Sequence, residues 1–113
     1  DSRCLLIKSN SDKSWSYSYK KYFRAKKGDK FSFNVSVKLQ GDKLSAYAGV
    51  IAFDESKDAV SWTYISEEFD TTEEWVTMER AFIISDEISF IMFKVSGNGV
   101  GEYRFDDISF SKK

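Results

Sequence analysis

The stretch of sequence that decides the fold is FSFNVSVKLQ, residues 31–40. Apolar side chains occupy every second position of it: Phe31, Phe33, Val35, Val37 and Leu39. Strict alternation over this length is typical of a β-strand with one buried face and one face in solvent. Three of the polar residues between them, Asn34, Lys38 and Gln40, then share the solvent face.

The same two-residue period recurs along the chain. Just before this stretch, Trp15, Tyr17 and Tyr19 alternate with serines. Further strands are expected at residues 3–8, 46–54, 59–65, 75–84, 87–95 and 101–111. Turn-forming residues separate these segments at intervals of roughly eight to twelve residues, which is the spacing of a sandwich or barrel. The acidic segment 66–74 is expected to be a long loop. About eight strands without a convincing helix predict an all-β fold, a two-sheet antiparallel β-sandwich of the jelly-roll type.

Length and composition predict one domain over residues 1–113, with aromatic residues to spare. The length is that of a single domain, and the apolar fraction is 42%. Aromatic residues make up 17% of the chain: ten Phe, six Tyr and three Trp. This is more than an ordinary core requires, so some rings are expected on the surface. Because the chain opens with Asp1 and has no apolar leader, we expect it to be part of a larger protein.

Charge is distributed unevenly along the chain and argues against nucleic acid as a partner. Residues 1–43 carry eleven Lys/Arg and four Asp/Glu, a net charge of +7, whereas residues 44–113 carry six and fourteen, a net charge of −8. A nucleic-acid-binding domain usually has an overall basic balance. We expect the two halves to interleave in one sandwich, with opposite charges near one another. Membrane insertion is not expected either, because no segment approaches the ~20 consecutive apolar residues of a membrane span.

The residue types that most enzymes rely on are missing. The sequence contains no His, which excludes Ser-His-Asp and Cys-His nucleophile systems and zinc sites with His ligands. Its single cysteine, Cys4, excludes an internal disulfide and is expected to be a small buried side chain. A glycosidase could use two carboxylates, but the adjacent pairs Glu67-Glu68 and Glu73-Glu74 are expected to be solvated. Neighbours on a strand also point to opposite faces, so enzymatic activity is not expected.

One further carboxylate pair, Asp106-Asp107, interrupts an otherwise apolar strand. Apolar residues occupy positions 103 and 105 before the pair and 108 and 110 after it, so the period slips by one residue. Such a slip indicates a β-bulge and would direct one carboxylate inward. An inward carboxylate needs a cation or several hydrogen-bond donors. The sequence leaves two interpretations open: a calcium ion held by these residues, or hydrogen bonds from them to a neighbouring loop.

The closing stretch GEYRFDDISF, residues 101–110, resembles the last strand of jelly-roll carbohydrate-binding modules. The modules in question are the xylan- and β-glucan-binding type, galactose-binding-domain-like in fold, that are attached to bacterial glycoside hydrolases. Shorter similarities are CLLI at residues 4–7, AKKGDKF at 25–31, and Trp75-Val76 followed by FII at 82–84. The resemblance implies a non-catalytic domain that binds polysaccharide, secreted or at the bacterial cell surface. It also implies that Asp106 or Asp107 is a structural calcium ligand and that Trp75 is a core residue.

Aromatic residues are the first candidates for contact with a sugar, because sugars stack their C–H faces on exposed rings. Trp62 and Tyr64, which alternate beside the acidic segment, are the main candidates, and Tyr47 is a weaker one. The row Trp15, Tyr17 and Tyr19 belongs either to the core or to a sugar-facing strip. Asn34, Lys38 and Gln40 would supply hydrogen bonds if their face is the concave one, and otherwise form an ordinary solvated strand face.

Three functions follow from these observations. The leading hypothesis is a carbohydrate-binding module, monomeric and tethered to a larger chain, that brings a parent enzyme to its glycan. The alternative is a structural or protein-interaction β-sandwich, a spacer or adhesion domain of a surface protein, whose core takes up the aromatic residues. A small lyase or hydrolase would need convergent catalytic groups that the sequence does not offer. Exposure of the Trp side chains distinguishes the first two.

Overall fold

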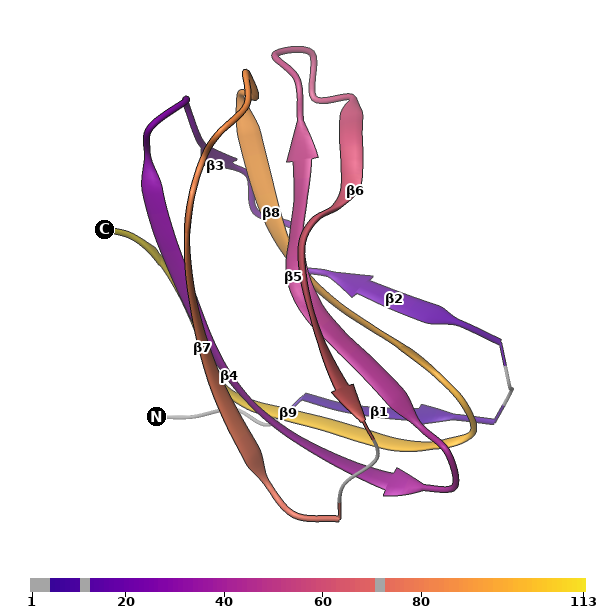
Figure 1. Ribbon diagram of the computed structural model, residues 1–113. Coiled ribbons are helices and arrows are strands. Elements are labelled where there is room, and N and C mark those ends of the chain that lie inside the picture. Colours follow the sequence, from indigo (N-terminus) through magenta and orange to yellow (C-terminus); the bar gives the residue numbers. More distant parts are fainter. Residues whose placement is uncertain (1–4, 11–12, 71–72) are drawn as a thin grey trace.

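The computed structural model describes residues 5–10, 13–70 and 73–113, which form nine β-strands and no helix (Figure 1). The strands are β1 (Leu5–Ser9), β2 (Trp15–Ser18), β3 (Phe23–Arg24), β4 (Lys30–Gly41), β5 (Ser45–Phe53), β6 (Ala59–Asp70), β7 (Val76–Ile83), β8 (Phe90–Asn98) and β9 (Gly101–Lys112). Cys4 lies outside the described residues. Within the described ranges there is therefore no helical segment long and apolar enough to cross a bilayer.

The strands form two antiparallel sheets packed face to face. One sheet has four strands in the order β1-β9-β4-β7. The other has five, in the order β2-β8-β5-β6 with β3 paired to β8. Each sheet draws strands from both halves of the chain, and Arg24 of the basic half forms an ion pair with Glu55 of the acidic half at 3.6 Å. The predicted all-β sandwich and its interleaved halves are confirmed.

The core lies between the sheets and follows the alternation seen in the sequence. The inward residues of β4 are all at most 1% exposed: Phe31, Phe33, Val35, Val37 and Leu39. They pack against the inward residues of the five-stranded sheet, among them Val50, Phe93 and Val95. Phe33 and Phe110 of β9 have parallel, stacked rings with centroids 6.4 Å apart. Burial of about 25 cal/mol per Å2 of apolar surface makes this layer the main source of stability.

The period slip at Asp106-Asp107 is a β-bulge, as predicted. Asn34 of β4 pairs with Ser109, but Ser36 pairs with Asp106, so the register between β4 and β9 shifts there. Asp107 takes the left-handed conformation with φ of 52°. The bulge does not send a carboxylate into the core: Asp106 is half-buried and Asp107 is exposed.

Three other expectations need correction. Residues 66–70 continue β6 rather than forming a loop, because they pair with Ser45–Gly49 of β5. Phe23–Arg24 adds a ninth, very short strand that extends the sheet along β8. Trp75 is not a core residue, since it precedes the edge strand β7 and 45% of it is exposed.

Candidate functional site

The outward face of the five-stranded sheet has two hollows lined by polar and aromatic side chains. On β5, the residues Ala46, Ala48, Val50 and Ala52 belong to the main core. The alternate residues Tyr47, Gly49, Ile51 and Phe53 therefore point outward, and their partners on β8 are Ser96, Lys94, Met92 and Phe90. The strands β5 and β6 change direction partway along their length, as Figure 1 shows. Two hollows lie side by side on this face.

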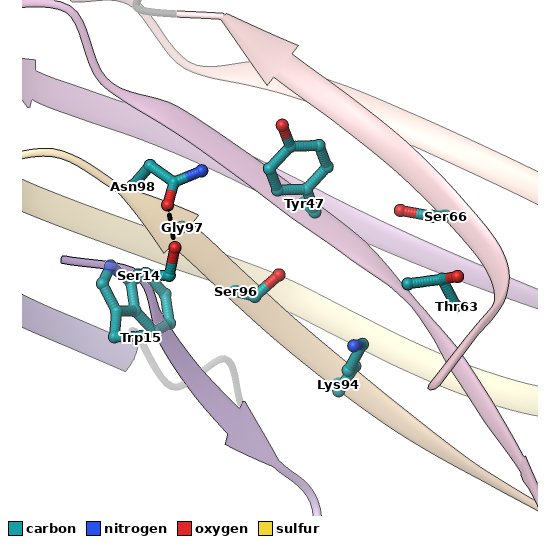
Figure 2. A pocket seen from close by; sticks show the side chains of 9 residues that line it. All are labelled: Ser14, Trp15, Tyr47, Thr63, Ser66, Lys94, Ser96, Gly97 and Asn98. Atoms are coloured by element: carbon teal, nitrogen blue, oxygen red, sulfur yellow. Dashed lines mark hydrogen bonds between the residues drawn. The ribbon is translucent and has the colours of Figure 1, made fainter. Parts of the chain in front are cut away.

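The first hollow is polar, with a volume of about 260 Å3. It is lined by Ser14, Trp15, Tyr47, Thr63, Ser66, Lys94, Ser96, Gly97 and Asn98, drawn in Figure 2. Hydroxyl, amide and ammonium groups predominate, and the Ser14 hydroxyl donates a hydrogen bond to the Asn98 amide oxygen. Gly97 lies opposite Trp15 across the strand pair, and a Cβ there would come within 2.8 Å of the Trp15 ring. The glycine therefore makes room for the indole.

The second hollow is apolar, with a volume of about 230 Å3. Its lining consists of Ser18, Lys20, Tyr22, Ile51, Phe53, Trp62 and Met92. Beneath it, Ile51, Phe53, Phe90 and Met92 form a second buried cluster, separate from the main core. Trp62 lines the hollow beside this cluster and is 63% exposed. The two hollows adjoin because Ile51 and Met92 lie two residues from Gly49 and Lys94 on the same two strands.

A bulge in β6 brings two adjacent residues to this one face. Pairing with β5 shifts between Val50–Ile65 and Ala52–Ser61, so residues 62–64 stand opposite Ile51 alone. Trp62 lines the apolar hollow and its neighbour Thr63 the polar one, although neighbours on a regular strand point to opposite faces. At the same level a Cβ on Gly49 would overlap the carbonyl oxygen of Ile65. The bulged strand therefore lies close over Gly49, and a larger residue there would displace it.

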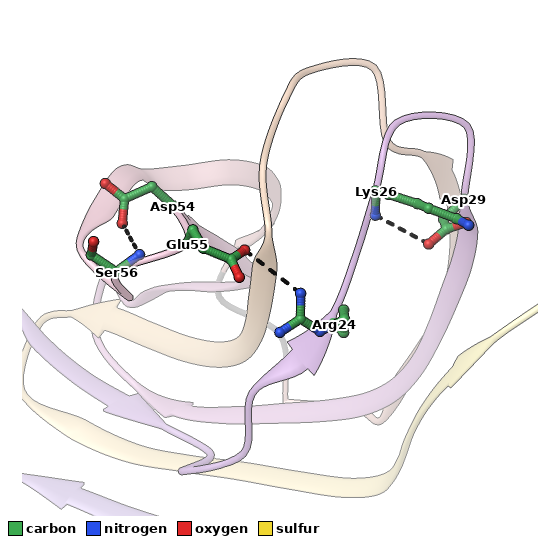
Figure 3. A network of polar contacts seen from close by, with 6 residues as sticks. All are labelled: Arg24, Lys26, Asp29, Asp54, Glu55 and Ser56. Atoms are coloured by element: carbon green, nitrogen blue, oxygen red, sulfur yellow. Dashed lines mark hydrogen bonds and ion pairs between the residues drawn. The ribbon is translucent and has the colours of Figure 1, made fainter.

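The turn between β5 and β6 places the Lys57 ammonium beside the apolar hollow. The Asp54 carboxylate accepts hydrogen bonds from the backbone N–H of Ser56 at 2.9 Å and of Asp58 at 3.0 Å. In this turn Lys57 adopts a φ of 66°, and its Nζ lies 4.8 Å from the centroid of the Tyr22 ring. Figure 3 shows the same turn joined to Arg24 through the Glu55 ion pair. The Arg24 guanidinium also lies over Phe90, 4.6 Å from its centroid.

The structure brings three of the predicted sugar-contacting residues to this face. Trp62 lines the apolar hollow, and Tyr47 and Trp15 line the polar one. Tyr64, by contrast, packs against the main core, and its hydroxyl oxygen accepts a hydrogen bond from the Ser85 backbone N–H at 3.0 Å. It lines neither hollow.

The aromatic row of β2 faces the interior side of its strand. The Trp15 ring contacts Tyr103 edge-on at a centroid distance of 4.8 Å, and Tyr19 contacts Phe93 at 5.5 Å. Tyr17 lies between them, in edge-on contact with Tyr19, and is 45% exposed at the margin of the sandwich. Of the two interpretations of this row, the packing of Trp15 and Tyr19 favours the core, and only Trp15 also reaches the outward hollow.

The polar candidates of β4 lie on the other side of the molecule. Asn34, Lys38 and Gln40 alternate with the core residues of β4, which belongs to the four-stranded sheet. The Asn34 amide contacts the Ser109 hydroxyl at 3.2 Å, and Lys38 pairs across the strands with Arg104. Of the described residues, none from the four-stranded sheet lines either hollow, so these three lie away from the hollow that Trp62 lines.

Several residues of the hollows were not predicted from the sequence. They are Ser14, Ser18, Lys20, Tyr22, Thr63, Ser66, Lys94, Ser96 and Asn98. One signal was available: Lys94, Ser96 and Asn98 alternate along β8 in the same way as the polar residues of β4. The alternation marks both as outward faces, but which face is hollowed depends on the bulge in β6 and on the small side chains Gly49 and Gly97.

Two ionisable groups of the polar hollow are shifted by their surroundings. Burial lowers the pKa of the Lys94 ammonium. Burial also raises the pKa of the Tyr47 phenol, and the Glu68 carboxylate, which accepts a hydrogen bond from that phenol at 3.5 Å, raises it further. Both shifts disfavour the charged form of the group.

The predicted calcium ligands lie on the bulge of β9, away from both hollows. The Asp106 carboxylate accepts a hydrogen bond from the Asp107 backbone N–H at 2.8 Å, and Asp107 lies 3.5 Å from the Ser36 hydroxyl. Among the described residues, no cluster of three or more His, Cys, Asp or Glu is placed to hold a metal ion. Because calcium takes six to eight oxygens, these two side chains alone do not complete a site, and calcium here stays a prediction.

Comparison with known proteins shows which solved structures share this fold. No family model matches the sequence, and no curated protein matches it. Among solved structures, a CBM4 carbohydrate-binding module superposes with a TM-score of 0.63 and 13% identity, over 97% of this chain and 71% of that one. The chain has the fold of a carbohydrate-binding module.

Two further modules share this fold and were solved with bound sugars. A CBM61 module in complex with β-1,4-galactotriose gives a TM-score of 0.55 and 18% identity, over 99% of this chain and 88% of that one. The CBM22-1–GH10 modules of a Clostridium thermocellum endo-1,4-β-D-xylanase, complexed with xylohexaose, give 0.57 and 18%, over 81% and 19%. Identities this low establish a common architecture. The two hollows described above are features of this chain and are not inferred from those modules.

Proposed function

We propose that this domain binds a polysaccharide or oligosaccharide along the outward face of the five-stranded sheet. The observation that carries the proposal is Trp62, a mostly exposed indole beside a hollow lined by hydroxyl and amide groups. A sugar offers the complementary surface, because each ring has an apolar C–H face and a rim of hydroxyls. The apolar hollow would take the face of one residue, and the polar hollow would hydrogen-bond the hydroxyls of the next.

The distribution of rings supports binding over the structural alternative. A spacer domain would take up its aromatic residues in the core, but four remain substantially exposed: Tyr17, Tyr22, Trp62 and Trp75, at 45%, 40%, 63% and 45%. Tyr22 and Trp62 line the same hollow. Two exposed rings over one depression are suited to holding a flat ligand, whereas a spacer has no use for them.

Among the described residues, no pair of carboxylates converges on either hollow. Hydrolysis of a glycosidic bond usually needs two carboxylates on either side of it. No Asp or Glu lines either hollow. Of the pair Glu67-Glu68, the first forms an ion pair with Arg80 and the second accepts a hydrogen bond from Tyr47, so the two diverge. The site therefore supports binding without catalysis.

We further propose that the domain is tethered as a monomer to a secreted or surface-exposed bacterial enzyme. A binding domain of this kind raises the effective concentration of the glycan at an attached active site without any new contact. The fold shared with sugar-binding modules of larger enzymes supports this context.

Affinity electrophoresis through gels containing a panel of plant and microbial glycans tests the function. We expect at least one glycan to retard the protein, and Trp62→Ala to reduce its affinity at least tenfold, since ring stacking is lost. Trp75→Ala is the matched control, because Trp75 is also exposed but lines neither hollow. Unchanged migration on every glycan would overturn the proposal, and equal losses in the two variants would refute the assignment of the face.

A further inference from the structure

Lys94 is the cation of the polar hollow, and it sits at the centre of the outward face. It lies on β8 directly opposite Gly49 of β5, which has no side chain of its own. Its neighbours along the strand and across the hollow are hydroxyl residues, Ser96, Thr63 and Ser66, as Figure 2 shows. Lys94 is half-buried and lines the hollow, so part of its side chain is shielded from solvent.

This ammonium lacks the anionic partner that a half-buried charge normally has. In the described part of the chain Lys94 forms no salt bridge and no hydrogen bond to a carboxylate, in contrast to Arg24, Arg80, Arg104 and Lys112. Its pKa is lowered by burial, with no carboxylate acting in the opposite direction. Partial burial of an unpaired charge is unfavourable, and pairing with an anion from outside relieves that penalty.

Further cations stand at the neighbouring hollow. Lys20 lines the apolar hollow, and the Lys57 ammonium lies against Tyr22 at its margin. In the described residues neither forms a salt bridge with a carboxylate. Glu68, a carboxylate beside the polar hollow, accepts a hydrogen bond from Tyr47. Lys94 and Lys20 therefore line the hollows without a carboxylate partner among the described residues, whereas Lys57 shares its turn with Asp54, Glu55 and Asp58.

Resting on the proposed function, we propose that the ligand is an acidic glycan, whose anionic substituent pairs with the Lys94 ammonium while a sugar face stacks on Trp62. A neutral hydroxyl would also hydrogen-bond an ammonium, but hydrogen bonds between two charged groups are shorter and about twice as strong. A carboxylate of a uronic acid and a sulfate ester share this chemistry. The stack on Trp62 selects for a sugar, and Lys94 selects for its charge.

The test uses pairs of glycans that differ only in charge. Polygalacturonate is compared with its methyl ester, glucuronoxylan with its carboxyl-reduced form, and dextran sulfate with dextran, each in affinity gels and by calorimetry. We expect an acidic member to bind at least tenfold more tightly than its neutral partner, and less tightly as salt is added. Binding to a carboxylate pair or only to the sulfate pair tells the two sources apart, and either supports an acidic ligand.

Three variants connect this preference to one residue. Lys94→Met keeps the aliphatic length without the charge, and we expect it to lose about tenfold in affinity for the acidic glycan and clearly less for the neutral partner, so that the preference between the two falls. Lys94→Arg should keep most of the preference. Lys38→Met is the matched control, since Lys38 is also half-buried at mid-strand but lies on the four-stranded sheet.

The possible failures are distinct. Equal binding of acidic and neutral partners, or an unchanged preference in Lys94→Met, would overturn the acidic ligand and leave carbohydrate binding intact. A preference lost equally in Lys38→Met would show a general charge effect and also overturn it. Absence of binding to every glycan, neutral or acidic, would overturn the proposed function and this inference together.

Discussion

At the scale of single residues, exposure follows local geometry more than residue type. Trp15 and Trp62 are both Trp, yet Trp15 packs against Tyr103 and Phe105 while Trp62 is 63% exposed. The sequence marks Trp62 as a candidate through its alternation with Tyr64, yet the bulge in β6 separates the two, and Tyr64 joins the core. A two-residue period predicts faces only where the strand is regular, so a bulge removes the information.

The Tyr103 hydroxyl is a residue-scale test of the interior. The side chain is fully buried, and its O–H donates a hydrogen bond to the Gly99 carbonyl at 2.6 Å. Tyr103→Phe leaves that carbonyl without its donor, so we expect a loss of about 1 kcal/mol in the free energy of unfolding, measured by urea denaturation at pH 7. Unchanged stability would show that the hydroxyl is not held as described.

The same residue has a pH signature. Burial raises the pKa of Tyr103 above its usual value of 10.0, so the folded state binds this proton more tightly than the unfolded state. The resulting stability is complete below pH 10 and is lost as the pH rises through the pKa of the folded protein. Tyr103→Phe should therefore make the stability decline less steeply above pH 10, and an equally steep decline would assign the effect to other groups.

At the scale of elements, the final strand shows what a pattern can and cannot predict. The one-residue slip at Asp106-Asp107 predicts the bulge because side-chain period and strand pairing are coupled. The direction of the two carboxylates is not predictable in the same way, since it depends on the left-handed conformation of Asp107. The extension of β6 over residues 66–70 was missed because this acidic, outward-facing segment resembles a loop, although β5 pairs with it.

Calcium at this bulge is tested at the same scale. If Asp106 and Asp107 hold the ion, adding calcium after EDTA treatment should raise the thermal midpoint by several degrees, because a ligand bound only by the folded state stabilises it. Asp106→Asn should abolish the rise, while Asp86→Asn, in the β7–β8 connection, should not. A midpoint that is the same in calcium and EDTA would contradict the prediction.

At the scale of the whole molecule, the sequence predicts a sandwich with two outward faces but does not distinguish them. Lys38 on β4 and Lys94 on β8 both alternate with core residues. Only the assembled sheets show that the hollows lie on the face of Lys94. They arise where β6 bulges against β5 and where glycines leave space on β5 and β8. Such features join segments far apart in sequence, which explains why the site residues of β8 could not be chosen from the sequence.

The most direct test of the account measures whether a bound glycan covers Trp62. A Trp75→Phe variant retains Trp15 and Trp62. Of these two, Trp62 is the more exposed, since Trp15 is half-buried against Tyr103 and Phe105. Acrylamide quenching is recorded with and without a saturating amount of the glycan that retards the protein most strongly. The account predicts that the glycan lowers quenching to the level of the Trp62→Phe/Trp75→Phe double variant. Quenching that stays unchanged while the glycan is bound would contradict it.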